Sequence, residues 1–226
     1  MRNLLVLFVL VFIPLPVASQ ADSAGRSASA GQGKTEYVCP PCGCDHDETL
    51  LDTPGPCPDC GMAMVDRATT LTLTAIPAFL KVNDSVWTGG QPTIAQLGLL
   101  KAEGVKTIIN LRMHEEHDWA REEAKAREMG IAYLNIPVDY DAPKGADVDS
   151  FLRATDELSG KGRTFIHCTA AIRVGSFWMI RRVVRDGWEY DKAREEASQI
   201  GLRRDGTWVD FAKTSIESRA TVAESS

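Results

Sequence analysis

Apolar and polar positions follow two alternating patterns from about residue 81 onward. Short apolar runs predict buried strands at residues 106–112, 131–138 and 163–168. Helices are predicted between and after these runs, at residues 93–104, 115–130, 146–160, from about 173, 190–201 and 207–218. The first has apolar residues at helical spacing, and the second is a charged surface helix closed by Gly130. Strands that alternate with helices pair in parallel through right-handed crossovers. The pattern therefore predicts an α/β fold, a three-layer sandwich with a mostly parallel central sheet.

The same pattern divides the chain into segments. Residues 37–66 are rich in Cys and Pro and lack helical periodicity, so they need a metal or disulfides to hold a fold. Residues 67–80 are predicted to connect this module to the α/β domain, which is expected at residues 81–218. Residues 219–226 are predicted to form a disordered tail.

The first segment has the layout of an export signal. Residues 1–19 open with Arg2, continue as an apolar run and end in small residues, which is typical of a secretory signal peptide. An uncleaved membrane anchor is the alternative, but the run is short and is broken by Pro14 and Pro16. Residues 20–36 are rich in Ser, Ala and Gly, as in a flexible linker. We expect an exported protein, periplasmic or secreted, with no stable membrane insertion after cleavage.

Composition narrows the class of partner. The 226 residues are 44% hydrophobic and 25% charged, which is enough apolar material for a globular core. The formal net charge is −6, and no block of Lys and Arg stands out. This balance argues against nucleic acid as a partner.

Five of the six cysteines fall in the Cys-rich module. Two C-x2-C pairs, separated by fourteen residues, have the spacing of a tetrahedral thiolate site made by Cys39, Cys42, Cys57 and Cys60. We predict that these four cysteines bind zinc or another thiophilic heavy-metal ion. Disulfide bonds are the alternative, and an exported location favours them. Cys44 and His46 lie close by and could replace or supplement a ligand.

The two ends of the module carry a family resemblance. The stretches YVCP and GPCPDCGMAMV resemble the small bacterial heavy-metal-binding domain found in copper- and heavy-metal-handling proteins. That family usually has a histidine where this chain has Cys42, so the ligand set here is softer. The resemblance implies metal binding but does not specify the function.

The sixth cysteine, Cys168, stands alone where a strand turns into a helix. Backbone N–H groups at such a turn converge on an anion and favour the thiolate form of a cysteine. Arg173, five positions later, supplies a guanidinium suited to two-point binding of phosphate-like oxygens. These are the parts needed for phosphoryl or sulfur transfer. The alternative is a buried cysteine that only packs in the core.

Five motifs occur in order between Val86 and about Leu202: WTGGQPT, GVKTIINLR, EEH, YLNIPVDYDAP and HCTAAIRVGSFW. They resemble a group of bacterial phosphatase-like domains that includes the beta-lactamase hydrolase-like proteins. This group belongs to the protein-tyrosine and dual-specificity phosphatase superfamily. The resemblance implies a tyrosine-phosphatase-like fold and hydrolysis of a phosphomonoester, with no cofactor required.

The resemblance also implies roles by position. Cys168 would be the nucleophile of a phosphocysteine intermediate, Arg173 would hold the phosphoryl oxygens, and His167 would orient the loop. The further residues expected at the substrate are Thr169, Ala170, Ala171, Ile172 and Val174.

The general acid is expected from the loop that follows the strand at 131–138. Asp139 and Asp141 both lie there, and Asp139 is favoured because it is nearest the strand end. Either aspartate could instead be a solvated turn carboxylate before Pro143.

Two features depart from the superfamily pattern. Four residues separate Cys168 from Arg173, which is the spacing of rhodanese-type sulfurtransferases, so a Cys168 persulfide is the enzymatic alternative. Ala170 and Ala171 stand where such loops often have glycine, and a positive φ would cost alanine on the order of 1 kcal/mol. A non-catalytic alternative is a metal-handling or sensing protein whose α/β domain only binds anions.

Other charged residues receive simpler interpretations. The sequence HEEH at 114–117 has metal-ligand residue types, but its position mainly indicates the acidic start of a helix. Arg112 either faces the site from a strand end or pairs with Glu115 or Glu116. A solvated helix face is predicted for Arg181, Arg182 and Arg185.

Overall fold

The computed structural model describes residues 35–39, 46, 49–203 and 206–224. The predicted signal peptide, most of the predicted linker, Cys42 and Cys44 lie outside the described residues. Within the described ranges, no helix is both long enough and apolar enough to cross a bilayer.

A five-stranded sheet forms the centre of the α/β domain. Its strands, in spatial order, are β3 (Leu80–Lys81), β4 (Val86–Gly89), β7 (Arg163–His167), β5 (Val105–Asn110) and β6 (Ala132–Asn135). The edge strand β3 is antiparallel to β4, and all other neighbours are parallel. The prediction of a mostly parallel sheet is confirmed.

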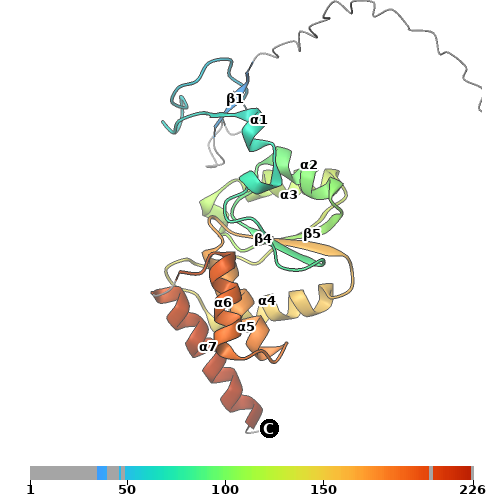
Figure 1. Cartoon of the computed structure of the whole chain (residues 1–226), viewed down its shortest axis with the longest axis vertical. Coiled ribbons are helices and arrows are strands. Elements are labelled where there is room, and N and C mark those ends of the chain that lie inside the picture. The colour runs from blue at the N-terminus through green and yellow to red at the C-terminus, as the bar shows by residue number, and fades with distance from the viewer. Residues whose placement is uncertain (1–34, 40–45, 47–48, 204–205, 225–226) are drawn as a thin grey trace, which may run out of the picture. The chain divides into compact units, whose positions relative to one another are not determined.

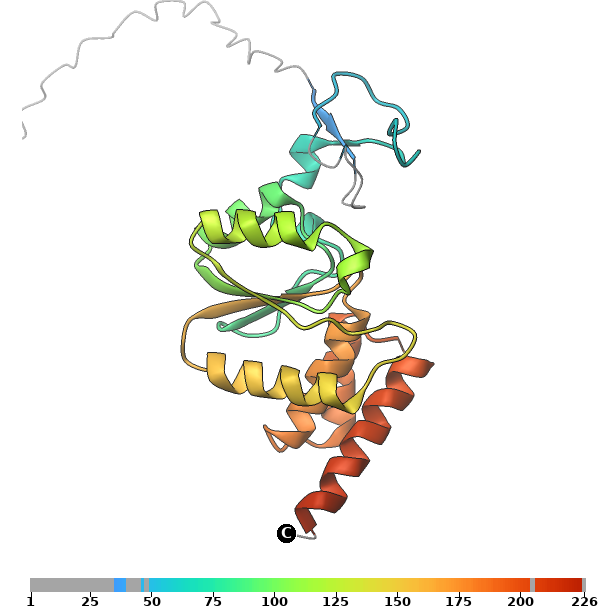
Figure 2. The ribbon, with the colours of Figure 1, turned by 180° about the vertical axis from the view of Figure 1, so that it is seen from behind.

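Helices cover both faces of this sheet, which gives three layers (Figures 1 and 2). One face carries α2 (Ile94–Ala102) and α3 (Trp119–Glu128). The other side holds α4 (Gly145–Leu158), α5 (Ile172–Val184), α6 (Tyr190–Ile200) and α7 (Thr207–Glu224). The predicted three-layer sandwich is therefore confirmed.

The apolar runs of the strands feed two separate cores. Side chains alternate between the faces of a strand, so neighbouring residues point to opposite layers. Ile108 and Phe165 pack in the core on the α2–α3 side. Ile109 and Ile166 pack in the core on the other side. Both faces are buried, which explains why these strands are continuous apolar runs rather than alternating ones.

The four parallel strands end in register. Gly89, His167, Asn110 and Asn135 are the last residues of β4, β7, β5 and β6, and each is paired with its neighbour in that order. The loops that follow the four strands therefore start side by side at one edge of the sheet. In α/β folds this carboxyl edge is where ligands bind, and Cys168 is the first residue beyond it on the central strand β7.

Two predicted segment boundaries differ from the structure. The predicted connector contains helix α1 (Arg67–Thr70) and the 3-10 helix η1 (Leu73–Ala75), and Ile76 packs in the core beside Phe165. Its second half thus belongs to the α/β domain. The predicted disordered tail is wrong for residues 219–224, which continue α7. No Gly or Pro ends this helix, and the side chain of Arg219 donates to Asp149 Oδ1 at 2.6 Å.

Candidate active site and cysteine cluster

The loop after Cys168 contains a strained alanine, which the sequence raised as a possibility at Ala170 and Ala171. Cys168 is 2% exposed at the end of β7, and α5 begins four residues later. Ala171, directly before α5, has φ +63°, in the left-handed region that favours glycine. The strain is tolerated because Ala171 is fully buried and its carbonyl accepts the Gly175 N–H at 2.9 Å.

Glycines let neighbouring segments approach this loop closely. The backbone N–H of Gln91 donates to the carbonyl of Thr169 at 3.1 Å. A Cβ at Gly90 would lie 2.6 Å from the same Thr169 oxygen. A Cβ at Gly201 would lie 3.1 Å from Ala171 Cβ, and its φ of +139° also requires glycine. The WTGGQPT motif therefore supports the loop with backbone from the segment that follows β4.

Arg173 lies beneath the loop with its guanidinium fixed by four acceptors. NH1 donates to Glu116 Oε1 at 2.5 Å and to the Val138 carbonyl at 2.8 Å. NH2 donates to Glu116 Oε2 at 2.6 Å and to Thr169 Oγ1 at 3.1 Å. Its Nε is buried without a partner among the described residues. Burial lowers the pKa of Arg173, but its hydrogen bonds to Glu116 and the electrostatic attraction of Cys168 and Glu116 outweigh burial and raise the pKa.

Glu116 is a site residue that the sequence indicated only as a possible partner of Arg112. It ends the 3-10 helix η2 (His114–Glu116) and receives bonds from Arg173, from Thr169 Oγ1 at 3.2 Å and from the Met113 N–H at 2.9 Å. Burial raises the pKa of Glu116, but these bonds and the charges of Arg173 and Arg112 lower it to about 2. The signal for it was present in the EEH motif. The HEEH stretch does not form a metal-ligand cluster within the described part of the chain.

Arg112 takes the second of its two predicted roles. It is 5% exposed, and its Nε lies 3.4 Å from Glu116 Oε2. Its NH1 donates to Gln91 Oε1 at 2.8 Å. Burial lowers the pKa of Arg112, although the neighbouring Glu116 acts in the opposite direction. Arg112 therefore helps to fix Glu116, which in turn fixes Arg173.

His167 is fully buried before the nucleophile position. Its Nε2 lies 2.9 Å from Oε1 of Glu122, a residue of α3 that is also buried. The aromatic ring of Phe165 stacks on its other side at 5.7 Å. The prediction that His167 orients the loop stays a prediction, but its ring is held by these contacts.

The two candidate acids lie in different settings. Asp139 Oδ1 accepts the backbone N–H groups of Asp141 at 2.9 Å and Ala142 at 3.3 Å, as a turn carboxylate does. Asp141 lines a cavity of about 270 Å³ beside the loop. Both lie just beyond Val138, whose carbonyl is bonded by Arg173.

This cavity, here called the loop cavity, adjoins the Cys168 loop through Ile172. Its lining residues include Tyr140, Ile172, Leu202, Arg203 and Trp208. The rings of Tyr140 and Trp208 are 5.5 Å apart, and Arg173 lies 5.7 Å from the centre of the Tyr140 ring. A group attached to an anion bound at the loop would have room here.

The other predicted substrate contacts divide between surface and core. Ala170 is exposed, and Thr169 is tied to Arg173 and Glu116 by its hydroxyl. The side chain of Val174 is fully buried in the core. Any substrate contact at this last position is therefore limited to its backbone.

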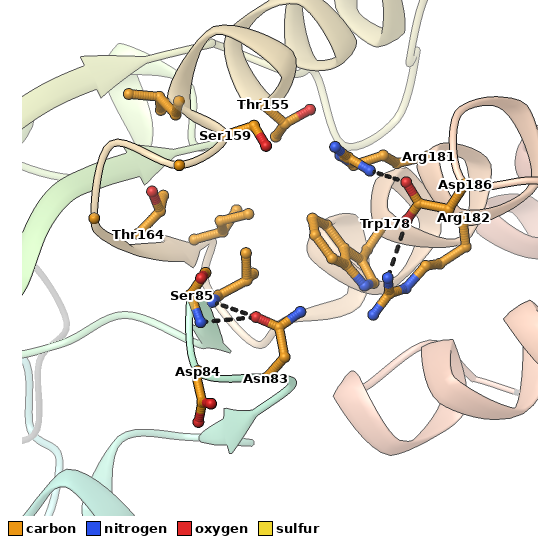
Figure 3. A pocket seen from close by; sticks show the side chains of 15 residues that line it. Asn83, Asp84, Ser85, Thr155, Ser159, Thr164, Trp178, Arg181, Arg182 and Asp186 are labelled. Atoms are coloured by element: carbon orange, nitrogen blue, oxygen red, sulfur yellow. Dashed lines mark hydrogen bonds and ion pairs between the residues drawn. The ribbon is translucent and has the colours of Figure 1, made fainter.

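A second cavity, of about 440 Å³, opens at the opposite edge of the sheet, where β4 and β7 begin (Figure 3). Asp186 there accepts from Arg181 at 2.5 Å and from Arg182 at 3.0 Å. These arginines are only 13% and 12% exposed, so the predicted solvated face is wrong for them, whereas Arg185 is 43% exposed. The charges of Arg181 and Arg182 are matched by the carboxylates of Asp156, Asp186 and Glu196.

The Cys-rich module brings three of its four predicted metal ligands together. The Sγ atoms of Cys39, Cys57 and Cys60 all lie within 4.8 Å of one another. The Cys39 and Cys60 sulfurs are 3.4 Å apart, well beyond the roughly 2 Å of a disulfide. Thiolates around a tetrahedral zinc are about 3.8 Å apart, given Zn–S bonds of about 2.3 Å. The three sulfurs therefore fit a thiophilic ion, and Cys42, outside the described residues, remains the predicted fourth.

The backbone of the module holds this geometry. Strands β1 (Tyr37–Val38) and β2 (Val65–Asp66) pair antiparallel and join the two ends of the predicted module. At the second C-x2-C pair, the Gly61 N–H donates to the Cys57 carbonyl at 2.9 Å, and Gly61 has φ +72°. His46 Nδ1 lies 2.7 Å from Asp59 Oδ2, next to Cys60 in the chain.

Comparison with known proteins adds a family to this geometry. A family model described as "DSP-PTPase phosphatase fused to NAD+ Kinase" matches residues 75–210. A beta-lactamase hydrolase-like protein of Xylella fastidiosa is 27% identical over 135 residues, 57% of this chain and 31% of that protein. The dual specificity protein phosphatase TpbA of Pseudomonas aeruginosa is 24% identical over 123 residues, 54% of each chain. This chain thus spans about a third of the first relative's length and about half of the second's.

Solved structures share the fold of the α/β domain. A DUF442 protein from Shewanella putrefaciens is 25% identical with a TM-score of 0.56, covering 65% of this chain and 96% of that chain. TpbA of P. aeruginosa, crystallised as a variant in complex with pTyr, is 20% identical with a TM-score of 0.51, covering 63% of this chain and 90% of that chain. The TpbA likeness concerns the fold alone.

Proposed function

Because the chain belongs over residues 75–210 to the family of DSP-PTPase phosphatases fused to NAD+ kinase, we propose that its α/β domain is a cysteine-dependent phosphatase of the protein-tyrosine and dual-specificity type. The observation that carries this proposal is the loop from Cys168 to Arg173 at the carboxyl edge of the sheet. Its buried thiol, its turn at a helix start and its anchored guanidinium face one small region. These are the requirements for binding and attacking a phosphoryl group.

The reaction proceeds in two displacements. The thiolate sulfur of Cys168 attacks phosphorus, an S–P bond forms, and the bond from phosphorus to the substrate oxygen breaks. The departing oxygen takes a proton from an aspartic acid of the loop after β6, and Asp139 remains the predicted donor with Asp141 as its alternative. Water, deprotonated by the same carboxylate, then attacks phosphorus, releases inorganic phosphate and restores the thiolate. Arg173 Nε offers a donor to the phosphoryl oxygens while Glu116 holds the other two nitrogens.

The substrate is a phosphomonoester whose organic group occupies the loop cavity. The aromatic side chains of Tyr140 and Trp208 give that cavity a wall suited to a planar group. The phosphotyrosine bound by TpbA, a protein of the same fold, supports an aryl phosphate as the first substrate to test.

The Cys-rich module is proposed to bind zinc or another thiophilic ion through Cys39, Cys42, Cys57 and Cys60. Support comes from the three sulfurs within 4.8 Å and from the softness of thiolate ligands. Bound metal would hold together a module whose own apolar cluster is small. The protein is further proposed to be exported, on the basis of the signal-like residues 1–19.

The test uses the mature protein on an aryl phosphate and, separately, on thiosulfate with cyanide. Phosphate release that disappears in Cys168→Ser is the expected result. Thiocyanate formation would instead favour the sulfurtransferase alternative, which the four-residue spacing between Cys168 and Arg173 keeps open. Inactivity in both assays, with metal binding that survives Cys168→Ser, would favour a non-catalytic metal-handling protein.

A further inference from the structure

A buried carboxylate in α3 contacts the segment before Cys168 from behind. Glu122 is 2% exposed, and its Oε1 lies 2.9 Å from His167 Nε2. Its Oε2 accepts from Gln91 Nε2 at 2.9 Å and lies 3.1 Å from His117 Nε2. His117 and His167 are themselves 5% and 0% exposed, so this polar cluster is shielded from water.

A carboxylate in this position needs strong compensation to remain ionised. Burial raises the pKa of Glu122, but the electrostatic attraction of His167 and the hydrogen bonds from His117 and Gln91 lower it well below the ordinary range. Tyr133 of β6 also faces this charge, and burial together with Glu122 raises the Tyr133 pKa. Glu122 is therefore a fixed negative charge at neutral pH, and the surrounding groups are arranged around it.

The same carboxylate reaches the far end of the loop through Gln91. Gln91 donates to Glu122 with Nε2 and accepts from Arg112 NH1 at 2.8 Å with Oε1. Arg112 in turn lies against Glu116, the partner of Arg173. The backbone N–H of Gln91 also bonds the loop itself at Thr169. One chain of contacts thus runs from the residue before Cys168 to the guanidinium of Arg173.

We propose that Glu122 is a positioning residue of the proposed phosphatase, which holds His167 and Gln91 so that the two ends of the Cys168–Arg173 loop stay at the spacing that a tetrahedral oxyanion requires. The inference rests on the proposed function only for the identity of the oxyanion. Glu122 reaches the reacting sulfur through His167, so its effect is on the shape and field of the loop.

Glu122→Gln tests this role because it keeps the size of the side chain and removes its charge. The charged groups around position 122 are Arg112 beyond β5 and Glu123 of α3. The titratable groups that face it are His117 from the η2–α3 segment, His167 from β7 and Tyr133 from β6. Without the carboxylate, the loop N–H groups lose alignment and stabilise the thiolate less. Losing these N–H contacts should raise the midpoint pH for alkylation of Cys168 by iodoacetamide by about one unit, against the smaller opposite effect of removing a like charge.

The measurement follows the Cys168 peptide by mass spectrometry in the full chain, with orthovanadate as the protecting oxyanion. Protection by vanadate should weaken by roughly tenfold in Glu122→Gln and recover in part in Glu122→Asp, which restores the charge. Glu123→Gln removes the next carboxylate along the same helix, which is 26% exposed and pairs with Arg127. It is the matched control and should change neither quantity.

Four results would overturn the proposal. In folded Glu122→Gln, an unchanged midpoint pH would show that only the packing of this side chain matters. A lower midpoint would show that its charge acts only as a like charge on the thiolate. Unchanged protection by vanadate would show that the geometry of the loop does not depend on the charge of Glu122. If Glu122→Gln does not fold, Gln91→Leu breaks the second arm of the network and must weaken vanadate protection, or the proposal fails. None of these readouts requires turnover, so a protein with no phosphatase activity would still decide the question.

Discussion

The guanidinium of Arg173 and the carboxylate of Glu116 form a two-point ion pair, with NH1–Oε1 at 2.5 Å and NH2–Oε2 at 2.6 Å. The pair occupies the two terminal nitrogens and leaves Nε without a partner among the described residues. Because Arg173 is 1% exposed, an unfixed guanidinium here would be a costly buried charge. Glu116 therefore compensates the charge and also sets which edge of the guanidinium faces the loop.

Replacing Glu116 by Gln should lower kcat/KM strongly, because Glu116 orients the guanidinium of Arg173. A neutral amide cannot accept both charge-assisted hydrogen bonds from Arg173, which contribute about 1.5–3 kcal/mol each. Arg173 would therefore lose its fixed orientation. We expect kcat/KM on an aryl phosphate to fall by roughly 10- to 100-fold. Glu115→Gln changes the exposed neighbour in the same 3-10 helix and serves as the control. Full activity in Glu116→Gln would show that Arg173 is oriented without this carboxylate.

The same carboxylate predicts a pH dependence of stability. Its pKa falls from an ordinary 4.5 to about 2 in the folded protein, so the folded state binds this proton less readily than the unfolded state does. The stabilisation is fully present above about pH 4.5 and is lost as the pH falls towards 2. Urea denaturation should therefore show a gap between wild type and Glu116→Gln that narrows on acidification. A gap that widens below pH 4.5 would contradict this assignment.

The left-handed conformation of Ala171 predicts how glycine at this position changes the free energy of unfolding, and the neighbouring Ala170 provides a control. Ala171 has φ +63°, which costs an L-residue about 1–2 kcal/mol, whereas glycine is free of this cost. Glycine also loses more chain entropy on folding, by about 0.5–1 kcal/mol. Ala171→Gly should therefore raise the free energy of unfolding by up to about 1 kcal/mol. Ala170→Gly, where φ is not positive, should lower it. Thermal denaturation of the two variants measures this difference directly, and a loss of stability in both would refute the strain argument.

The sequence predicted the strands β5, β6 and β7 and the position of Cys168, but not the strands β3 and β4. Apolar runs such as residues 106–112 are buried on both faces, so they had to be central parallel strands, and the order of motifs placed Cys168 at a strand end. The EEH motif pointed to the right region, but the pairing of Glu116 with Arg173 joins residues 57 apart in the chain. Local charge patterns cannot distinguish such a pair from a solvated helix start.

Similar limits explain the other differences. Helix α7 continues past Ser218 because the sequence carries no Gly or Pro stop, and a Ser-ending polar segment alone did not decide between helix and tail. Arg181 and Arg182 are partly buried against Asp186 because the turn after α5 folds back, which no helical period reveals. The pattern predicts a charged surface helix at residues 115–130, and only the packing of α3 against the sheet buries Glu122 beside His117, His167 and Gln91.

The cysteine cluster predicts a metal content that depends on the Cys-rich module and not on the α/β domain. Protein purified without chelator should carry about one zinc or other thiophilic ion per chain by elemental analysis, because four thiolates complete one tetrahedral site. Cys57→Ser removes a buried ligand of the cluster and should abolish this binding, with a large loss of metal affinity. Cys168→Ser lies in the other domain and should leave the metal content unchanged. Equal metal loss in the two variants, or a disulfide between Cys39 and Cys60 in the native protein, would show that thiolate coordination does not hold this module together.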